Sequence, residues 1–85
     1  MDQEAEACAE EAIRALGRRD APLARTSVSQ AYDFDHKLGA LADVVYLACS
    51  EIDDDGRVTT ATWNTLADAV GPKPLLAVVE ASRTG

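Results

Sequence analysis

The sequence contains few of the residues from which catalytic and metal sites are usually built. Its 85 residues include one histidine and two cysteines, and aromatic residues make up only 5% of the chain. No Cys-x-x-Cys pair, glycine-rich phosphate loop or Gly-x-Ser-x-Gly motif occurs. The histidine, His36, precedes Cys49 by 13 residues, which is about 20 Å along a continuous helix and too far for a catalytic pair. These absences predict a protein that is not an enzyme and that holds no cofactor.

Long apolar runs and an excess of positive charge are also absent. No stretch approaches the ~18 apolar residues of a membrane-spanning helix, and the start Met1-Asp2-Gln3-Glu4 lacks the basic and apolar regions of a signal peptide. Fifteen acidic residues against eight basic ones give a net charge of -7, which repels phosphate backbones and anionic lipid surfaces. We therefore expect a cytoplasmic protein whose partners are neither nucleic acids nor membranes.

Alanine is abundant in this chain, and only one short run, near its end, fits a β-strand pattern. Hydrophobic residues make up 47% of the chain, which is too many for a disordered protein. Much of that fraction is alanine, which favours close-packed helices over sheets. A chain of 85 residues has room for one core of marginal stability. The composition predicts a single all-α domain, a small bundle of four to five short helices with no sheet, which gains stability from a partner or from self-association.

Apolar residues recur at spacings of three and four in a series of segments. These segments predict helices over residues 4–16, 21–33, 36–50 and 60–70. Periodicity allows either a helix or a strand over residues 75–82, and a short helix is favoured because the chain has no partner strand. Cys8 and Cys49 fall on the apolar sides of the first and third helices, which predicts buried free thiols. A disulfide between Cys8 and Cys49 is the alternative, and it requires those two helices to lie side by side.

Residues that begin or end helices mark the boundaries between these segments. Asp35 can cap the third helix, or the second and third helices can form one continuous rod. A break is favoured, because a helix of about 30 residues is unusual in so small a domain. Thr59 or Thr60 can cap the fourth helix, and Gly71 and Pro72 are expected to end it.

The third segment is apolar around most of its circumference. Between Leu38 and Cys49 the only charged residue is Asp43. A helix with so broad an apolar surface is usually the central one. We expect this helix to contact all the others or to meet a binding partner.

Oxygen-bearing side chains alternate around a glycine between the third and fourth segments. When Gly56 is taken as the turn glycine, Asp53 and Asp55 stand at the third and fifth positions of the loop and Val58 at its apolar eighth position. The stretch from Glu51 to Trp63 therefore resembles the calcium loop of an EF-hand. The resemblance implies a helix-loop-helix in which Asp53 and Asp55 are calcium ligands.

The same stretch departs from the EF-hand pattern at two ligand positions. The first position is Glu51 in place of aspartate, and the twelfth is Thr62 in place of the bidentate glutamate. EF-hands also normally work in pairs, and the chain has no second loop of this kind. The other interpretation is a solvated acidic turn, Asp53-Asp54-Asp55-Gly56, with its carboxylates near the positive end of the fourth helix. A third interpretation is another acidic role, such as docking to a basic partner, and all three stay open.

The scarce aromatic residues are the candidates for contact with a partner. They are Tyr32, Phe34, Tyr46 and Trp63, and aromatic side chains commonly anchor protein interfaces. The alternative is that they fill volume in a core built largely from alanine. We predict a small acidic helical module for protein interaction or regulation, which binds a protein partner or a copy of itself. The alternative function is calcium binding by a degenerate EF-hand that uses the Asp53 to Gly56 loop.

Overall fold

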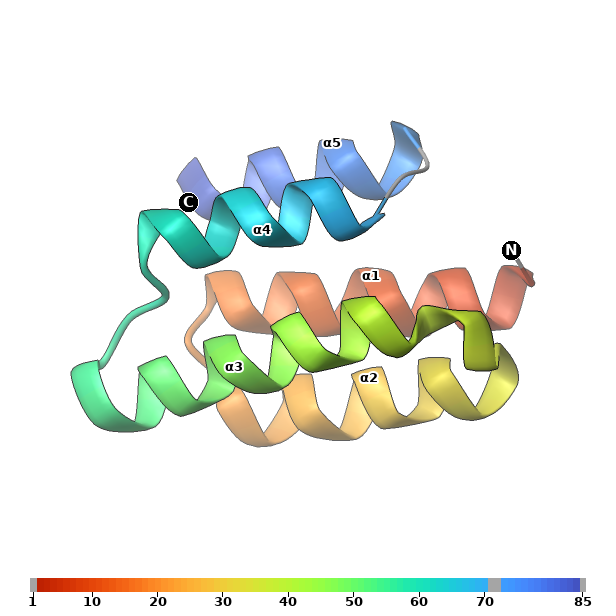
Figure 1. Cartoon of the computed structure of the whole chain (residues 1–85), viewed down its shortest axis with the longest axis horizontal. Helices are drawn as coiled ribbons and strands as arrows, with labels where there is room; N and C mark the ends of the chain where they lie inside the picture. Colours follow the sequence, from red (N-terminus) through yellow and green to blue (C-terminus); the bar gives the residue numbers. More distant parts are fainter. Residues whose placement is uncertain (1, 71–72, 85) are drawn as a thin grey trace.

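The chain folds into helices that pack in layers (Figure 1). The computed structural model describes residues 2–70 and 73–84. Two long helices form a hairpin, a third helix packs against both of them, and the last helix packs against the first, while among these residues the fourth helix contacts only the third and the last. In chain order these elements are α1 (Gln3–Gly17), α2 (Ala21–Phe34), the short 3-10 helix η1 (His36–Leu38), α3 (Gly39–Asp55), α4 (Thr60–Val70) and α5 (Lys73–Thr84). The described residues contain no strand, so the prediction of a small all-α bundle is confirmed.

The contact between α1 and α2 is the most extensive contact between two helices in the part of the chain that the structure describes. Both helices carry alanines without exposed surface, which we call the alanine seam: Ala5, Ala9, Ala12, Ala15, Ala24 and Ala31. Small side chains let two helix backbones approach closely, so alanine suits this contact. Larger side chains fill the space between the layers, and the largest fully buried ones are Ile13, Leu16, Leu41, Leu66 and Leu75.

Two of the predicted helix boundaries depend on residues with clear hydrogen bonds. Asp35 has an extended backbone, and its carboxylate accepts a hydrogen bond from the Lys37 N–H at 3.0 Å, so α2 and α3 are separate helices. Thr59 caps α4, because its hydroxyl oxygen accepts from the Thr62 N–H at 3.2 Å. The predicted stop at Gly71 and Pro72 lies outside the described residues.

The third helix continues five residues beyond the predicted end. The prediction ended it at Ser50, whereas α3 runs to Asp55. Ile52 explains the extension, because it continues the apolar stripe of α3 and packs against the core. Gly56 then ends the helix in the left-handed region with a φ of 77°, and its N–H donates to the Ile52 carbonyl at 2.9 Å. The prediction that an acidic loop begins at Glu51 is therefore wrong, and the glycine marks a helix end.

The third helix is also less central than predicted. It contacts α1, α2 and α4, but within residues 2–70 and 73–84 it does not contact α5. Its outer side leaves Tyr46 and Leu47 exposed. The helix α1 occupies the interior position, between α2 on one side and α5 on the other. The broad apolar surface of α3 therefore leaves part of an apolar face in contact with solvent.

Candidate functional site

Three of the four aromatic residues lie on the surface. Tyr32, Phe34 and Tyr46 keep 40%, 52% and 40% of their surface exposed. Trp63 keeps only 8% and belongs to the hydrophobic core. Burial is the normal state for large aromatic side chains in a small domain, since each can bury 150 to 250 Å² or so of surface. The exposure of three of them is therefore the unusual feature of this molecule.

The two tyrosines border one concave surface between α2 and α3. The concavity has a volume of about 400 Å³, and its lining residues are Tyr32, Gly39, Ala42, Asp43 and Tyr46. Gly39 lies against Tyr32, since a Cβ placed on Gly39 would meet the tyrosine ring at 3.8 Å. We call this concavity the aromatic face; Phe34, two residues beyond Tyr32 on α2, is also exposed but is not among its lining residues.

Polar contacts hold the two tyrosine rings in place. The Tyr32 ring lies against the imidazole of His36, with 4.9 Å between the ring centroids and 31° between the ring planes. The Tyr46 hydroxyl shares a hydrogen bond with the Ser29 hydroxyl of α2. Both rings are thus fixed by neighbours from an adjacent element, which lowers the conformational entropy that a partner must remove on binding.

The carboxylate of Glu51 in α3 accepts hydrogen bonds from residues at the start of α4. Its Oε1 atom accepts a hydrogen bond from the Thr59 N–H at 3.0 Å, and its Oε2 atom accepts one from the Thr62 hydroxyl at 2.7 Å. The Thr59 hydroxyl also donates to the same carboxylate, at 3.2 Å. These are the residues at the first, ninth and twelfth positions of the calcium-loop alignment. The structure joins them directly to one another, with no ion needed to bring them together.

The hydrogen bonds of Glu51 change its pKa. Burial alone raises the pKa of this carboxyl by desolvation, but the hydrogen bonds from Thr59 and Thr62 favour the charged form and outweigh that effect. The pKa of Glu51 therefore lies below its ordinary value. The ionised carboxylate is the form that stabilises the fold.

The predicted calcium ligands occupy the last turn of α3. Asp53 forms an ion pair with Arg25 of α2, and Asp55 is the final residue of the helix. Residues two apart on a helix point in different directions, so the two carboxylates do not converge. Within the described residues, no group of three or more histidine, cysteine, aspartate or glutamate side chains is placed to hold a metal ion. Calcium binding by this segment stays a prediction.

The two cysteines are free thiols within the helices. The Cys49 thiol is buried and donates to the Ala21 carbonyl at 3.5 Å, while the half-buried Cys8 lies 3.9 Å from the Gln30 side-chain oxygen. Desolvation by burial raises the pKa of both thiols, and neighbouring glutamates add to the effect at Cys8. A raised pKa favours the thiol over the nucleophilic thiolate. Their environment is therefore that of structural cysteines.

Sequence reasoning missed the small residues that make the aromatic face concave. Gly39 and Ala42 leave room beside the rings, and Asp43 provides a carboxylate at the rim. The sequence did indicate which side of α3 faces solvent, because Asp43 is the one charged residue in the apolar stretch of this helix. The packing of Gly39 beside Tyr32 could not be predicted, since it depends on how α2 meets η1.

Comparisons with known proteins leave the chain without a family assignment. No model of a protein family matches the sequence, and no curated protein or solved structure matches it. The helices described here are all too short or too polar to cross a membrane.

Proposed function

We propose that this protein is a small acidic helical interaction module, which regulates or assembles with a protein partner or a second copy of itself through the aromatic face. The observation that carries the proposal is the exposure of Tyr32, Phe34 and Tyr46 in a chain with only four aromatic residues. Tyrosine and phenylalanine are enriched where proteins meet, because they bury a large area at low entropic cost.

The form of the aromatic face supports this proposal. It is concave, both tyrosine rings are held by neighbouring residues, and the tyrosine hydroxyls and the Asp43 carboxylate supply polar atoms beside its apolar groups. The molecule exposes 4702 Å² in total, so a standard interface of about 800 Å² per partner would cover roughly one sixth of it.

Sedimentation equilibrium over a wide concentration range tests self-association through this face. The informative variant is the pair Tyr32→Ser and Tyr46→Ser, which removes both rings from the concavity. The matched control is Leu76→Ser, since Leu76 is also an exposed apolar side chain, at 37%, but lies on α5. We expect the tyrosine variant to weaken association by about tenfold or more, as loss of anchoring aromatic residues does, and the control to leave it unchanged.

The outcomes separate the two forms of the proposal. If the wild type stays monomeric at about 1 mM, self-association is excluded and the partner must be another protein. Such a partner would bind the wild type and Leu76→Ser, and it would not bind the tyrosine variant. If neither association nor retention depends on the two tyrosines, the aromatic face has no binding role and the proposal fails.

A further inference from the structure

A second concave surface lies at the side of the molecule where α1 and α5 end and where the chain passes from α3 to α4 (Figure 1). It encloses about 250 Å³. Three arginines line it, together with two residues that carry hydroxyl groups, and these are Arg19, Arg57, Arg83, Thr60 and Ser82. We call it the arginine cavity. It is separate from the aromatic face, which lies between α2 and α3.

Positive charge gathers around this cavity although the protein as a whole is acidic. An adjoining hollow shares Gly17 and Ser82 with the cavity, and two more arginines line it. With two arginines from the hollow and three from the cavity, this end of the molecule holds five of the eight basic residues in a chain of net charge -7: Arg14, Arg18, Arg19, Arg57 and Arg83. Like charges at close range repel one another, so such a cluster costs stability unless counter-charges offset it.

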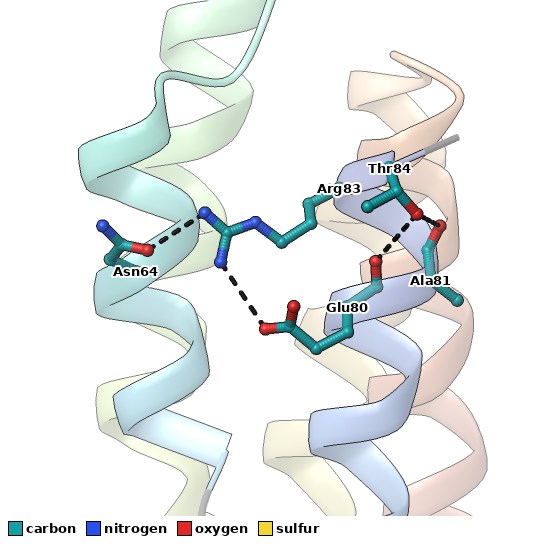
Figure 2. Close-up of polar contacts among 5 residues, drawn as sticks. All are labelled: Asn64, Glu80, Ala81, Arg83 and Thr84. Atoms are coloured by element: carbon teal, nitrogen blue, oxygen red, sulfur yellow. Dashed lines mark hydrogen bonds and ion pairs between the residues drawn. The ribbon is translucent and has the colours of Figure 1, made fainter.

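Three of these arginines have structural reasons for their positions. Arg14 lies in the last turn of α1 and Arg18 caps the same helix, where positive charge is favoured by the helix dipole. Arg83 joins α5 to α4, as Figure 2 shows, because it donates to the Asn64 side-chain oxygen at 3.0 Å and pairs with Glu80 at 3.5 Å. Helix stability and helix contacts account for these side chains.

Arg19 and Arg57 have no such explanation. Both side chains are exposed, and neither forms an ion pair or a side-chain hydrogen bond with the part of the chain that the structure describes. Arg57 belongs to the connection between α3 and α4, beyond the end of either helix. The fold therefore gives no reason for an arginine at either position.

The backbone at Arg19 makes its side chain still more unusual. Arg19 has a φ of 61°, in the left-handed region. The Asp20 N–H donates to the Ala15 carbonyl at 2.9 Å and the Arg19 N–H to the Leu16 carbonyl at 3.1 Å, which is the Schellman arrangement at the end of α1. The left-handed position of this arrangement is usually glycine, because other residues are strained there. A strained residue with an unpaired side chain at a cavity indicates that the side chain is used.

We propose that the arginine cavity binds a phosphate group, with Arg19 and Arg57 as its principal contacts. Each guanidinium group presents donors in a planar fork that matches the oxygens of a phosphate, and several forks can bind one dianion together. The hydroxyls of Thr60 and Ser82 add donors at the same surface. A bound dianion removes the repulsion among the arginines, which the protein alone leaves uncompensated at Arg19 and Arg57.

The dimensions of the cavity limit the ligand to a small group. Its volume of about 250 Å³ is below the usual 300 to 1,000 Å³ or so of a pocket for a drug-sized molecule. The negative charge of the remaining surface repels a long polyanion such as a nucleic acid. The phosphate is thus carried by a small molecule or by a single phosphorylated side chain of another protein.

Calorimetric titration of the intact chain with two probes tests the proposal and separates these two sources. The probes are pyrophosphate and a short peptide that contains one phosphoserine, and the fluorescence of Trp63, which lines the cavity, supplies a second readout. The variants are Arg19→Gly and Arg57→Ala. The matched control is Lys37→Ala, which removes one positive charge from η1, outside the arginine cavity.

We expect at least one probe to saturate with a dissociation constant below about 1 mM at about 50 mM salt. Arg19→Gly and Arg57→Ala should each weaken binding by about tenfold or more, since each removes a charge-assisted contact, and Lys37→Ala should change it less than about twofold. Because Arg19→Gly relieves backbone strain, it should melt no lower than the wild type, so its loss of binding cannot be ascribed to unfolding. Binding of pyrophosphate alone identifies a free phosphate compound as the ligand type, and tighter binding of the peptide identifies a phosphorylated protein. No saturation at about 10 mM of either probe, or an equal loss in Lys37→Ala, would overturn the proposal.

Discussion

Two glycines near the ends of long helices serve opposite purposes. Gly56 follows α3 and supplies a left-handed backbone, with a φ of 77°, and a Cβ built on it would meet nothing within 4 Å. Gly17 is the last residue of α1 and supplies the absence of a side chain. A Cβ there would lie 2.9 Å from the Ser82 carbonyl oxygen and 3.0 Å from the Ser82 Cβ of α5. The first glycine is required by conformation and the second by close packing.

The difference explains why an arginine occupies a glycine position. The chain places its glycine at the end of α1 where α5 approaches, two residues before the left-handed position of the same turn. That position falls on Arg19, which adopts φ 61° at a cost of about 1 to 2 kcal/mol. At α3 no neighbour competes for the glycine, so Gly56 takes the left-handed position itself.

The largest effect is expected from Gly17→Ala. Its added methyl group enters a contact already closed by the backbone of Ser82, so α5 must shift away from α1. We expect a loss of about 2 kcal/mol of unfolding free energy, as for overpacking of a core, and a fall of about 10 °C in Tm for a domain of this size. Thermal unfolding followed by circular dichroism measures it.

Gly39→Ala is the matched control for this prediction. The same methyl group added at Gly39 would meet only the Tyr32 ring at 3.8 Å, an ordinary contact. The backbone of Gly39 is helical, with φ −56°, so alanine should be neutral or should stabilise by up to about 1 kcal/mol. Equal melting temperatures for the two variants would show that α5 does not depend on the close approach at Gly17.

The second largest loss of unfolding free energy is expected from Glu51→Gln, which weakens the hydrogen bonds that hold the connection between α3 and α4. The substitution removes the charge that strengthens the hydrogen bonds from Thr59 and Thr62. We expect a loss of about 1 to 2 kcal/mol at neutral pH. Glu11→Gln, an exposed glutamate on α1, is the control.

The effect of Glu51→Gln should depend on pH with a definite sign. The pKa of Glu51 is lower in the folded protein than in the unfolded chain. Its stabilising contribution is therefore complete above the ordinary carboxyl pKa of about 4.3, and it is lost as the pH falls through the lower folded value. Urea unfolding at several pH values should show the wild type and the variant converging in acid. A difference that stays constant down to pH 2 or so would contradict the assigned cause.

Smaller effects of opposite sign are expected at the two left-handed positions. Gly56→Ala should destabilise by about 1 kcal/mol, because alanine is strained at positive φ and no contact offsets the strain. Arg19→Gly should stabilise by a similar amount, about 1 kcal/mol, because it relieves the same strain. Chemical denaturation of both variants in one buffer measures the pair. A loss of stability in Arg19→Gly would mean that the arginine side chain supports the fold.

The smallest effect is expected from calcium. In an EF-hand Gly56 would lie within the calcium loop, whereas here it follows the last residue of α3. That helix also holds Asp53 in an ion pair with Arg25. Binding would require the last turn of α3 to unwind and the ion pair to break. We expect no change in Tm between excess calcium and excess chelator, measured by calorimetry. A rise of several degrees with calcium would restore the EF-hand interpretation.

Much of the fold could be predicted from the sequence because it depends on local signals. The periodicity of apolar residues gives the helices, and the cap residues Asp35 and Thr59 give two of their starts. The end of α3 was missed because three consecutive aspartates suggested a turn, while Ile52 continued the helix on its buried side. The exposure of Tyr32 and Tyr46 and the gathering of Arg19, Arg57 and Arg83 depend on how distant helices meet, and no local pattern reports that.

The alanine seam makes the stability of this protein sensitive to replacement of its smallest buried residues by larger ones. A larger side chain at any of these alanines would have to displace the packed neighbours of α1 or α2, since none of them retains exposed surface. A shift of α1 would also move Gly17, and so disturb the packing of α5 against α1. Related chains should therefore vary their leucines and valines more freely than these alanines. A deep mutational scan would then find its most sensitive sites among the buried alanines, which have the smallest side chains of the core.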